Sequence, residues 1–341
     1  MSLSEIKKQV KNFSKEFIYE SSYSIGLSRM MVARKANASK LILTYHNVLP
    51  EGEMTPHYSN NVDITTATFE FQIKTLKDHF GIQPARKLND INQNGIFISF
   101  DDGMLNNIEI VEPILAKYDV TAMFGICSGL VDGSIYFIWR DYLFLILNGL
   151  KGKNILLSDL PTISGKEVSD SNLDFLANAI THYIESNGKM DHVYDYLSKL
   201  AKDNNIAISR KDVPQLRYTP MGIPDIQNLN HKGHLIASHT HSHRKLSMLS
   251  EKELEYEMKV SRSYFMDIIG SCDTLVYPYG SAKEVNDRVG ESAGDGGYKY
   301  AYMNIPTDNL NAQFFLPRLN MRNVATKSEY LGLLAGINKI I

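Results

Sequence analysis

The sequence predicts an α/β protein built on a parallel sheet, open or closed into a (β/α) barrel. From residue 40 onward, short apolar runs alternate with amphipathic helical patterns, as in chains that form parallel strands joined by helices. Reactive polar side chains follow several of these runs directly, and parallel barrels collect their functional residues at such strand ends. With 341 residues, 43% of them hydrophobic, the chain can bury a large core without disulfide support.

The expected strands are short apolar runs bounded by turn-forming residues. They are Leu41–Tyr45, Gly95–Phe100, Val120–Cys127, Leu235–Ser238, Asp273–Tyr277, Tyr298–Met303 and Phe315–Leu319, with a weaker candidate at Gly81–Pro84. The helices expected between the strands are Thr66–Phe80, Asn107–Tyr118 and Glu251–Ile269. The last of these begins with a capping box, Ser250–Glu253.

Between residues 134 and 217 the alternation of strands and helices stops. This stretch is a mostly helical insertion, with helices expected at Trp139–Leu150, Ser171–Asn187 and His192–Lys202. We therefore expect a single barrel domain over residues 40–341, interrupted by the insertion and preceded by a helical extension over residues 1–39.

The N-terminal segment is strongly basic. Residues 1–40 carry eight Lys or Arg and three Glu, a charge of +5 in a chain whose formal net charge is −2. Apolar residues recur among the lysines at helical spacing, namely Ile6, Val10, Phe13, Phe17 and Ile18. Two interpretations stay open: a helix packed on the body, or a surface helix that contacts anionic lipid or a phosphorylated substrate carrier.

The composition also excludes several classes of protein. A near-neutral net charge argues against a general nucleic-acid binder. Cys127 and Cys272 are too few for a disulfide framework and lack the spacing of a zinc knuckle. No apolar run reaches the ~18 residues of a membrane span, and the first residues lack the apolar core of a signal peptide. We expect a cytoplasmic protein, peripheral at the inner face of the membrane if the basic segment binds lipid.

Two strand ends carry the strongest chemical signals. Asp101 and Asp102 follow the strand Gly95–Phe100, and adjacent carboxylates need a metal or a hydrogen-bond network to separate their roles. The run His239-Thr240-His241-Ser242-His243 follows the strand Leu235–Ser238, and histidines in one short loop can share a metal. An acidic turn and a solvated polar loop are the alternatives. His231 and His234, just before that strand, are expected on the surface.

Three weaker signals follow other strands. The run Tyr277-Pro278-Tyr279-Gly280 could present a backbone N–H and aromatic rings to a ligand. His46 follows the strand Leu41–Tyr45, and Arg318 lies near the last strand, where a surface salt bridge is the alternative. One Asp and two His leave metal positions open for water and substrate, as in a catalytic zinc site. A second Asp beside them can accept a proton from that water.

This combination resembles the polysaccharide deacetylase family, hydrolases that remove N-acetyl or O-acetyl groups from chitin, peptidoglycan and related glycans. The run Phe100-Asp101-Asp102-Gly103 is similar to the family motif Thr-Phe-Asp-Asp-Gly, with Ser99 in place of Thr. The run from His239 to His243 matches the motif His-Ser/Thr-x-x-His. Tyr277-Pro278-Tyr279-Gly280 corresponds to the third motif, Arg-Pro-Pro-Tyr, without its arginine. The strand end Tyr45-His46 resembles a subgroup that acts on bacterial exopolysaccharides.

The resemblance implies a distorted, incomplete (β/α) barrel with Asp101 as the general base. It implies a metal site made of Asp102, His239 and His243, with His241 as an intervening residue that is not a ligand. The metal would be Zn²⁺, with Co²⁺, Ni²⁺ or Mn²⁺ as alternatives. The backbone N–H of Tyr279 would help to hold the oxyanion, with Tyr277 and Pro278 beside the substrate.

The chain departs from the family at two points. Many members have a C-terminal Leu-x-His motif whose histidine protonates the leaving amine, but residues 314–323 contain no histidine. His46 is the candidate for this role, because its strand end lies on the same face as those of Asp101 and His239. The arginine missing from the third motif leaves Asp101 without its usual partner, and Arg318 is the candidate substitute.

The leading hypothesis is a metal-dependent deacetylase of an amino sugar or glycan precursor, active in surface polysaccharide biosynthesis. The alternatives are a deformylase or other amide hydrolase of a lipid- or nucleotide-linked sugar, and a non-catalytic carbohydrate-binding protein. The insertion is expected to form the rim of the site. There Trp139, Tyr136 and Phe137 could stack on a sugar ring or could form an apolar helix face.

Overall fold

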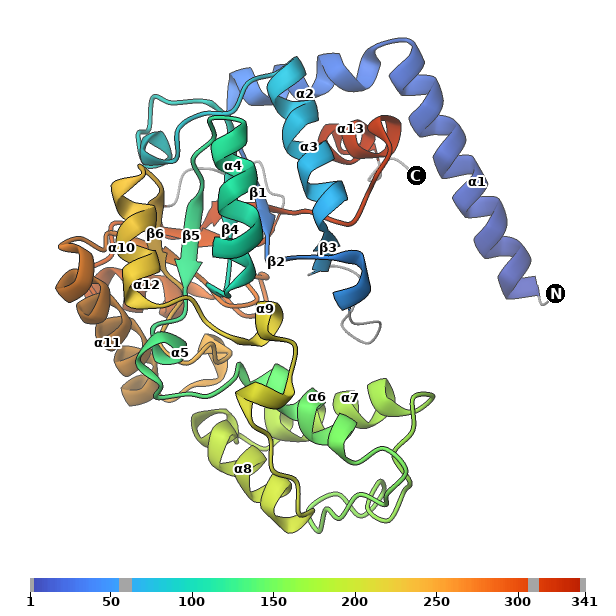
Figure 1. The fold of residues 1–341 in the computed structure, drawn as a ribbon, viewed down its shortest axis with the longest axis vertical. Coiled ribbons are helices and arrows are strands. Elements are labelled where there is room, and N and C mark those ends of the chain that lie inside the picture. Colours follow the sequence, from blue (N-terminus) through green and yellow to red (C-terminus); the bar gives the residue numbers. More distant parts are fainter. Residues whose placement is uncertain (1–2, 55–62, 306–312, 338–341) are drawn as a thin grey trace.

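Eight parallel strands form one sheet that curves into a nearly closed barrel, which confirms the expected fold class (Figure 1). A computed structural model describes residues 3–54, 63–305 and 313–337, and the side chains of residues 14 onward within these ranges. The strands follow the order β10-β1-β4-β5-β6-β7-β8-β9. They are β1 (Lys40–Tyr45), β4 (Gly95–Phe100), β5 (Met123–Ile126), β6 (Leu235–Ser238), β7 (Thr274–Val276), β8 (Tyr300–Met303), β9 (Leu316–Pro317) and β10 (Leu319–Asn320).

The last expected strand is split in two at Arg318. β9 pairs with β8 and β10 pairs with β1, so this one segment connects the two edges of the sheet. The sheet is therefore closed through this segment and does not end in two open edges. The weaker strand candidate at Gly81–Pro84 is wrong, although the Gln83 N–H donates to the Ile96 carbonyl at 2.8 Å.

Helices cover the outside of the barrel (Figure 1). They are α3 (Thr66–His79), α4 (Glu112–Lys117), α10 (Ile223–His231), α11 (Glu251–Ile269), α12 (Asp287–Asp295) and α13 (Lys327–Ala335). A π-helical turn, Asn107–Val111, precedes α4, and the short strands β2 (Asn47–Leu49) and β3 (Asp63–Thr65) pair with each other beside the barrel.

The insertion forms a helical lobe below the barrel in Figure 1. It follows α5 (Ser128–Asp132) and contains α6 (Trp139–Gly149), α7 (Leu173–Ser186), α8 (Val193–Asp203) and α9 (Gln215–Tyr218). Trp139 and Phe137 are buried in its apolar core, so neither ring is exposed to stack on a sugar. Tyr136 is exposed, and the Arg210 guanidinium lies over its ring at 4.5 Å.

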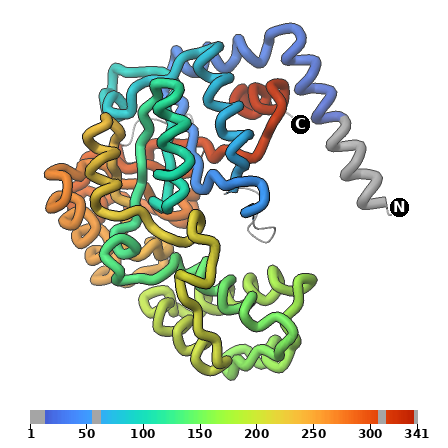
Figure 2. Tube along the Cα trace, viewed as in Figure 1, coloured from blue at the N-terminus to red at the C-terminus, as the bar shows by residue number. Residues whose placement is uncertain are grey.

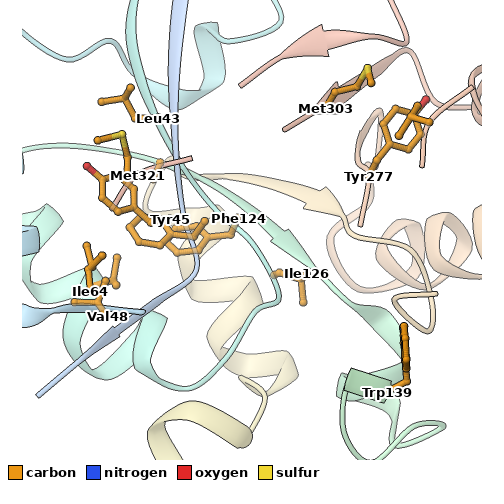
Figure 3. Close-up of a cluster of buried hydrophobic side chains, with 14 of the residues drawn as sticks. Leu43, Tyr45, Val48, Ile64, Phe124, Ile126, Trp139, Tyr277, Met303 and Met321 are labelled. Carbon is orange, nitrogen blue, oxygen red and sulfur yellow. The ribbon is translucent and has the colours of Figure 1, made fainter. Parts of the chain in front are cut away.

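Strand alternation separates a small core inside the barrel from the larger core around it. The inner core contains Ile42, Leu88, Phe97, Met123, Ala237, Val276 and Tyr302. Their strand neighbours Leu43, Tyr45, Phe124 and Ile126 point outward into the layer beneath the helices (Figure 3). Thr44 and Ala237 face the inside of the barrel. His46 and His239 each follow two residues later, so they lie on the same side of their strands. The same alternation that fills the barrel thus brings polar residues to its upper end.

The N-terminal helices α1 (Leu3–Ser24) and α2 (Leu27–Ala38) lie beside α13, which is drawn in red in Figure 2. Tyr19 and Val32 are buried on their inner faces. At Gly332 of α13 a Cβ would come within 2.2 Å of the Tyr19 ring, so this close helix contact requires glycine. Among the described residues, no helix has the length and apolar character needed to cross a bilayer.

The expected surface position of His234 is wrong. Its side chain is buried, and its Nδ1 accepts a hydrogen bond from the Ala122 N–H at 3.0 Å. Burial lowers the pKa of the imidazole to about 4, so the ring is neutral near pH 7. His234 precedes β6 where that strand runs beside β5, so its environment depends on a strand more than a hundred residues earlier.

Candidate functional site

The loops after β4 and β6 bring Asp102, His239 and His243 together. Asp102 Oδ1 lies 3.5 Å from His239 Nε2 and 3.3 Å from His243 Nε2. One ligand atom from each residue falls within 4.8 Å of the others. Among the described residues, this is the one group of three or more His, Cys, Asp or Glu side chains that could hold a metal ion.

The surroundings of these side chains suit a divalent cation. His239 Nδ1 lies 2.7 Å from the Val276 carbonyl, and donation to that oxygen leaves the lone pair of Nε2 directed at Asp102. Asp102 Oδ1 is buried and accepts no hydrogen bond from the described residues. Burial alone would raise the pKa of Asp102, but the two imidazoles beside it hold that pKa well below its usual range. One carboxylate and two imidazoles form a donor set that fits zinc and similar ions.

The backbone of the site is strained. Four of the six non-glycine residues with positive φ in the described part of the chain lie in its loops: Asp102 (76°), Thr240 (63°), His243 (54°) and Tyr279 (62°). Each such conformation costs about 1–3 kcal/mol and persists only where surrounding contacts enforce it. The strain is therefore concentrated where the three motifs meet.

Asp101 lies beside the metal-ligand cluster and is held by Arg318. Arg318 Nη1 and Nη2 donate to the two carboxylate oxygens at 2.7 and 2.8 Å, and both side chains are fully buried. Asn304 Nδ2 lies 3.5 Å from Asp101 Oδ2. Burial would raise the pKa of Asp101, but the charges of Arg318 and His239 outweigh this effect and lower it. Asp101 is therefore an ionised carboxylate.

Strand register places His46 next to Asp101. Tyr45 lies opposite Phe100 in the β1–β4 pairing, so the following residues of the two strands meet at the barrel end. His46 Nε2 is 3.9 Å from Asp101 Oδ2. Burial lowers the pKa of His46, and the carboxylates of Asp102 and Asp101 offset this only in part.

The third motif is divided between the core and the site. Tyr277 is fully buried among the residues of the hydrophobic core (Figure 3), and its role beside a substrate stays a prediction. Pro278 is also buried. Tyr279 packs against the His243 ring with a centroid distance of 5.1 Å, and its backbone N–H has no acceptor among the described residues. Arg318 contacts Asp101 rather than a ligand surface, because its terminal nitrogens bond the carboxylate deep in the barrel.

Two parts of this site were missed in the sequence. Asn304, at the end of β8, reaches Asp101, and Glu257, in the middle of α11, binds the histidine loop, His239–His243. A polar residue at a strand end is a signal that could have identified Asn304. Glu257 has no such signal, because one acidic residue on an amphipathic helix is ordinarily solvent-exposed.

Comparison with known proteins gives a family match over part of the chain. The profile of the polysaccharide deacetylase family matches residues 180–301, a segment that includes the histidine loop and Tyr279. Asp101, Asp102 and Arg318 lie outside the matched segment and reach the site through the barrel. The sequence has no significant match among curated proteins.

Several solved structures share the fold. A Streptococcus pyogenes deacetylase, PplD, solved in complex with acetate, is 16% identical with a TM-score of 0.53, over 86% of this chain and 97% of that one. A de-N-acetylase from Aggregatibacter actinomycetemcomitans is 14% identical with a TM-score of 0.53, over 89% and 99%. A Bacillus cereus polysaccharide deacetylase, BC0361, is 17% identical with a TM-score of 0.51, over 87% and 68%. Residues 180–301 are thus similar in sequence to the polysaccharide deacetylase family, and the whole chain shares the fold of these structures.

The buried pair gives a stability prediction. Arg318→Gln should lower the free energy of unfolding by about 3–5 kcal/mol, because it leaves the Asp101 carboxylate buried without its counter-charge. Urea unfolding at pH 7 measures this loss. The double variant Asp101→Asn/Arg318→Gln should lose clearly less than the sum of the two single losses. Additive losses would show that the two side chains do not stabilise each other.

Proposed function

We propose that this protein is a sugar deacetylase, a divalent-metal-dependent hydrolase that removes an N-acetyl or O-acetyl group from an amino sugar of a glycan precursor. We place this reaction in surface polysaccharide biosynthesis. One observation carries the proposal: an ionised, arginine-held carboxylate, Asp101, lies directly beside the cluster of Asp102, His239 and His243.

The metal ligands would be Asp102, His239 and His243, with Zn²⁺ as the first choice and Co²⁺, Ni²⁺ or Mn²⁺ as alternatives. A divalent cation bound there supplies a Lewis acid that polarises the acyl carbonyl and makes water a stronger acid. The protein supplies the proton acceptor. Asp101 is ionised because of Arg318, and it is close enough to His239, one of the proposed ligands, for that ring to lower its pKa further.

The oxyanion needs a donor that is already in place. The Tyr279 N–H is a candidate, because it has no acceptor among the described residues and belongs to a residue held in the left-handed region beside His243. A donor fixed before the reaction needs no reorganisation when charge develops on the acyl oxygen.

We assign to His46 the transfer of a proton to the leaving nitrogen. Its Nε2 is 3.9 Å from Asp101 Oδ2, so a small movement of either side chain brings the two within hydrogen-bond reach. The proton that Asp101 accepts from water can then pass to the imidazole, and from there to the nitrogen as the C–N bond breaks. Asn107 Nδ2 donates to the His46 carbonyl at 3.1 Å and fixes the backbone below the ring.

Mass spectrometry of acylated glycan precursors incubated with metal-loaded protein tests the proposal. A deacylated amino sugar together with released acetate is the expected product. Release of formate instead would favour the alternative, a deformylase of a lipid- or nucleotide-linked sugar. Binding of a glycan without any acid released would leave only a non-catalytic carbohydrate-binding protein.

Substitutions of the two aspartates should differ in their effects on metal content and on turnover. Asp102→Ala should abolish metal binding and activity together, because it removes the only carboxylate of the ligand set. Asp101→Asn should retain the metal but lose most turnover, because an amide cannot accept the proton. Metal content by elemental analysis and acetate release measure the two effects. An active Asn variant would refute the base assignment.

His46→Ala should keep its metal but lose at least about a hundred-fold in turnover on an amide substrate. An activated ester, whose leaving group needs no proton, should be spared much of that loss. Acetate release from an N-acetyl sugar and from a nitrophenyl acetate gives the two rates. If both substrates slow equally, or the metal is lost, His46 positions the substrate or supports the metal site instead.

We also propose that the outer faces of α1 and α2 contact an anionic membrane surface on its cytoplasmic side. Large apolar side chains are exposed on these helices and on the turn between them, among them Phe17 (65%), Ile25 (77%) and Met30 (63%). Arg29 and Arg34 are exposed beside them. Exposed apolar residues flanked by cations are typical of helices that lie in a lipid interface. The inner faces of the same helices pack on the body, so the helices can do both.

Replacing Phe17 and Ile25 with serine should weaken binding to vesicles that contain phosphatidylglycerol, and raising the salt concentration should weaken binding of the unaltered protein. Co-sedimentation measures both effects. Ile91→Ser, at an exposed apolar residue far along the chain (88%), is the matched control and should bind like the unaltered protein. Equal binding of all three proteins would contradict the proposal.

A further inference from the structure

We infer that Glu257 and Tyr194 are positioning residues that clamp the histidine loop from two sides and hold its ligands ready for a metal. Glu257 comes from α11 on the barrel, and Tyr194 comes from α8 in the helical insertion. This inference rests on the proposed metal site and deepens it, because it gives the insertion a task in building that site.

Glu257 supports the loop from the barrel side. It is fully buried, and its Oε2 accepts the backbone N–H groups of His241 and Ser242, both at 2.8 Å. Its Oε1 accepts the Ser242 hydroxyl and two nitrogens of Arg244, at 3.0 and 2.9 Å for the latter. Because both oxygens are occupied and Arg244 supplies a counter-charge, the buried carboxylate is compensated and can hold the loop rigidly.

The insertion supports the loop from the opposite side. The Tyr194 hydroxyl donates to the Ser242 carbonyl at 2.7 Å. Two further contacts join the insertion to the residues that follow the loop: Arg244 Nη1 donates to the Asp191 carbonyl at 2.8 Å, and Lys245 Nζ lies 2.7 Å from Glu185 Oε1. The insertion thus binds the chain at Ser242, Arg244 and Lys245, directly around the second histidine ligand.

The clamp acts on the strained part of the loop. Ser242 is fixed at its N–H by Glu257 and at its carbonyl by Tyr194, and the next residue, His243, has φ of 54°. Without these bonds the loop can relax into unstrained conformations in which His243 no longer faces Asp102. If the loop adopts the binding geometry for only a fraction of the time, the apparent Kd for the metal rises by the inverse of that fraction.

The test compares three variants of the full chain by Zn²⁺ titration against a chelator. Tyr194→Phe should raise the Kd for Zn²⁺ by about three- to ten-fold, which corresponds to the loss of one hydrogen bond. Glu257→Gln should raise it by about ten-fold or more, as is typical of residues that orient metal ligands. Tyr196→Phe is the matched control on the same helix, because the hydroxyl it removes has no hydrogen-bond partner among the described residues, and its Kd should not change.

Thermal unfolding of the metal-free proteins separates positioning from simple stabilisation. If Tyr194 positions the loop, Tyr194→Phe should raise the Kd for Zn²⁺ above that of Tyr196→Phe, and this difference should be larger than any difference in stability between the two variants, with both expressed as free energies. A lower midpoint with an unchanged Kd would overturn the inference and make Tyr194 a structural residue only. An unaltered protein that binds no Zn²⁺ would overturn the metal site itself, whereas normal Zn²⁺ binding by both Tyr194→Phe and Glu257→Gln would overturn only the clamp.

Discussion

The ion pair between Arg318 and Asp101 is the interaction on which the rest of the structure depends. A carboxylate in the interior of a barrel needs an opposite charge and donors for both oxygens, and the arginine fork supplies both. Arg318 can reach Asp101 because the closing strand breaks at this residue, with β9 on one side and β10 on the other. The segment that closes the barrel thus also supplies the charge that keeps Asp101 ionised.

The site combines rigid walls with strained loops. The inner apolar core ends below a polar layer in which Thr44 and Ser99 are hydrogen-bonded at 3.0 Å, and Arg318 Nη1 lies 3.3 Å from the same serine hydroxyl. At Gly125 a Cβ would lie 3.4 Å from Asp101 Oδ1 and 3.2 Å from Val276, so the wall is packed closely around the carboxylate. Above this layer the loops adopt conformations that a free chain would avoid, and buried hydrogen bonds hold them there.

Local patterns predicted the barrel and the main polar residues, because strand alternation and strand-end position are short-range properties. β4, β6 and α11 have the predicted bounds, and Asp102, His239 and His243 come together as strand-end residues of one parallel sheet. The split at Arg318, the burial of His234 and the orientation of Glu257 depend on partners far along the chain. Tyr277 shows the same limit: a motif next to the site places one side chain in the core and leaves its neighbour at the ligand cluster.

The split closing strand also has a kinetic consequence. Asp101 and Arg318 are 217 residues apart in sequence, and each half of the closing strand is only two residues long. Contacts between such distant residues close a long loop of chain, so we expect them to form after the contacts between strands that are neighbours in sequence. In that order of events, the strands from β1 to β8 would assemble around a carboxylate that has not yet met its counter-charge. The final closure of the barrel would therefore complete the fold and, in the same step, give Asp101 its counter-charge.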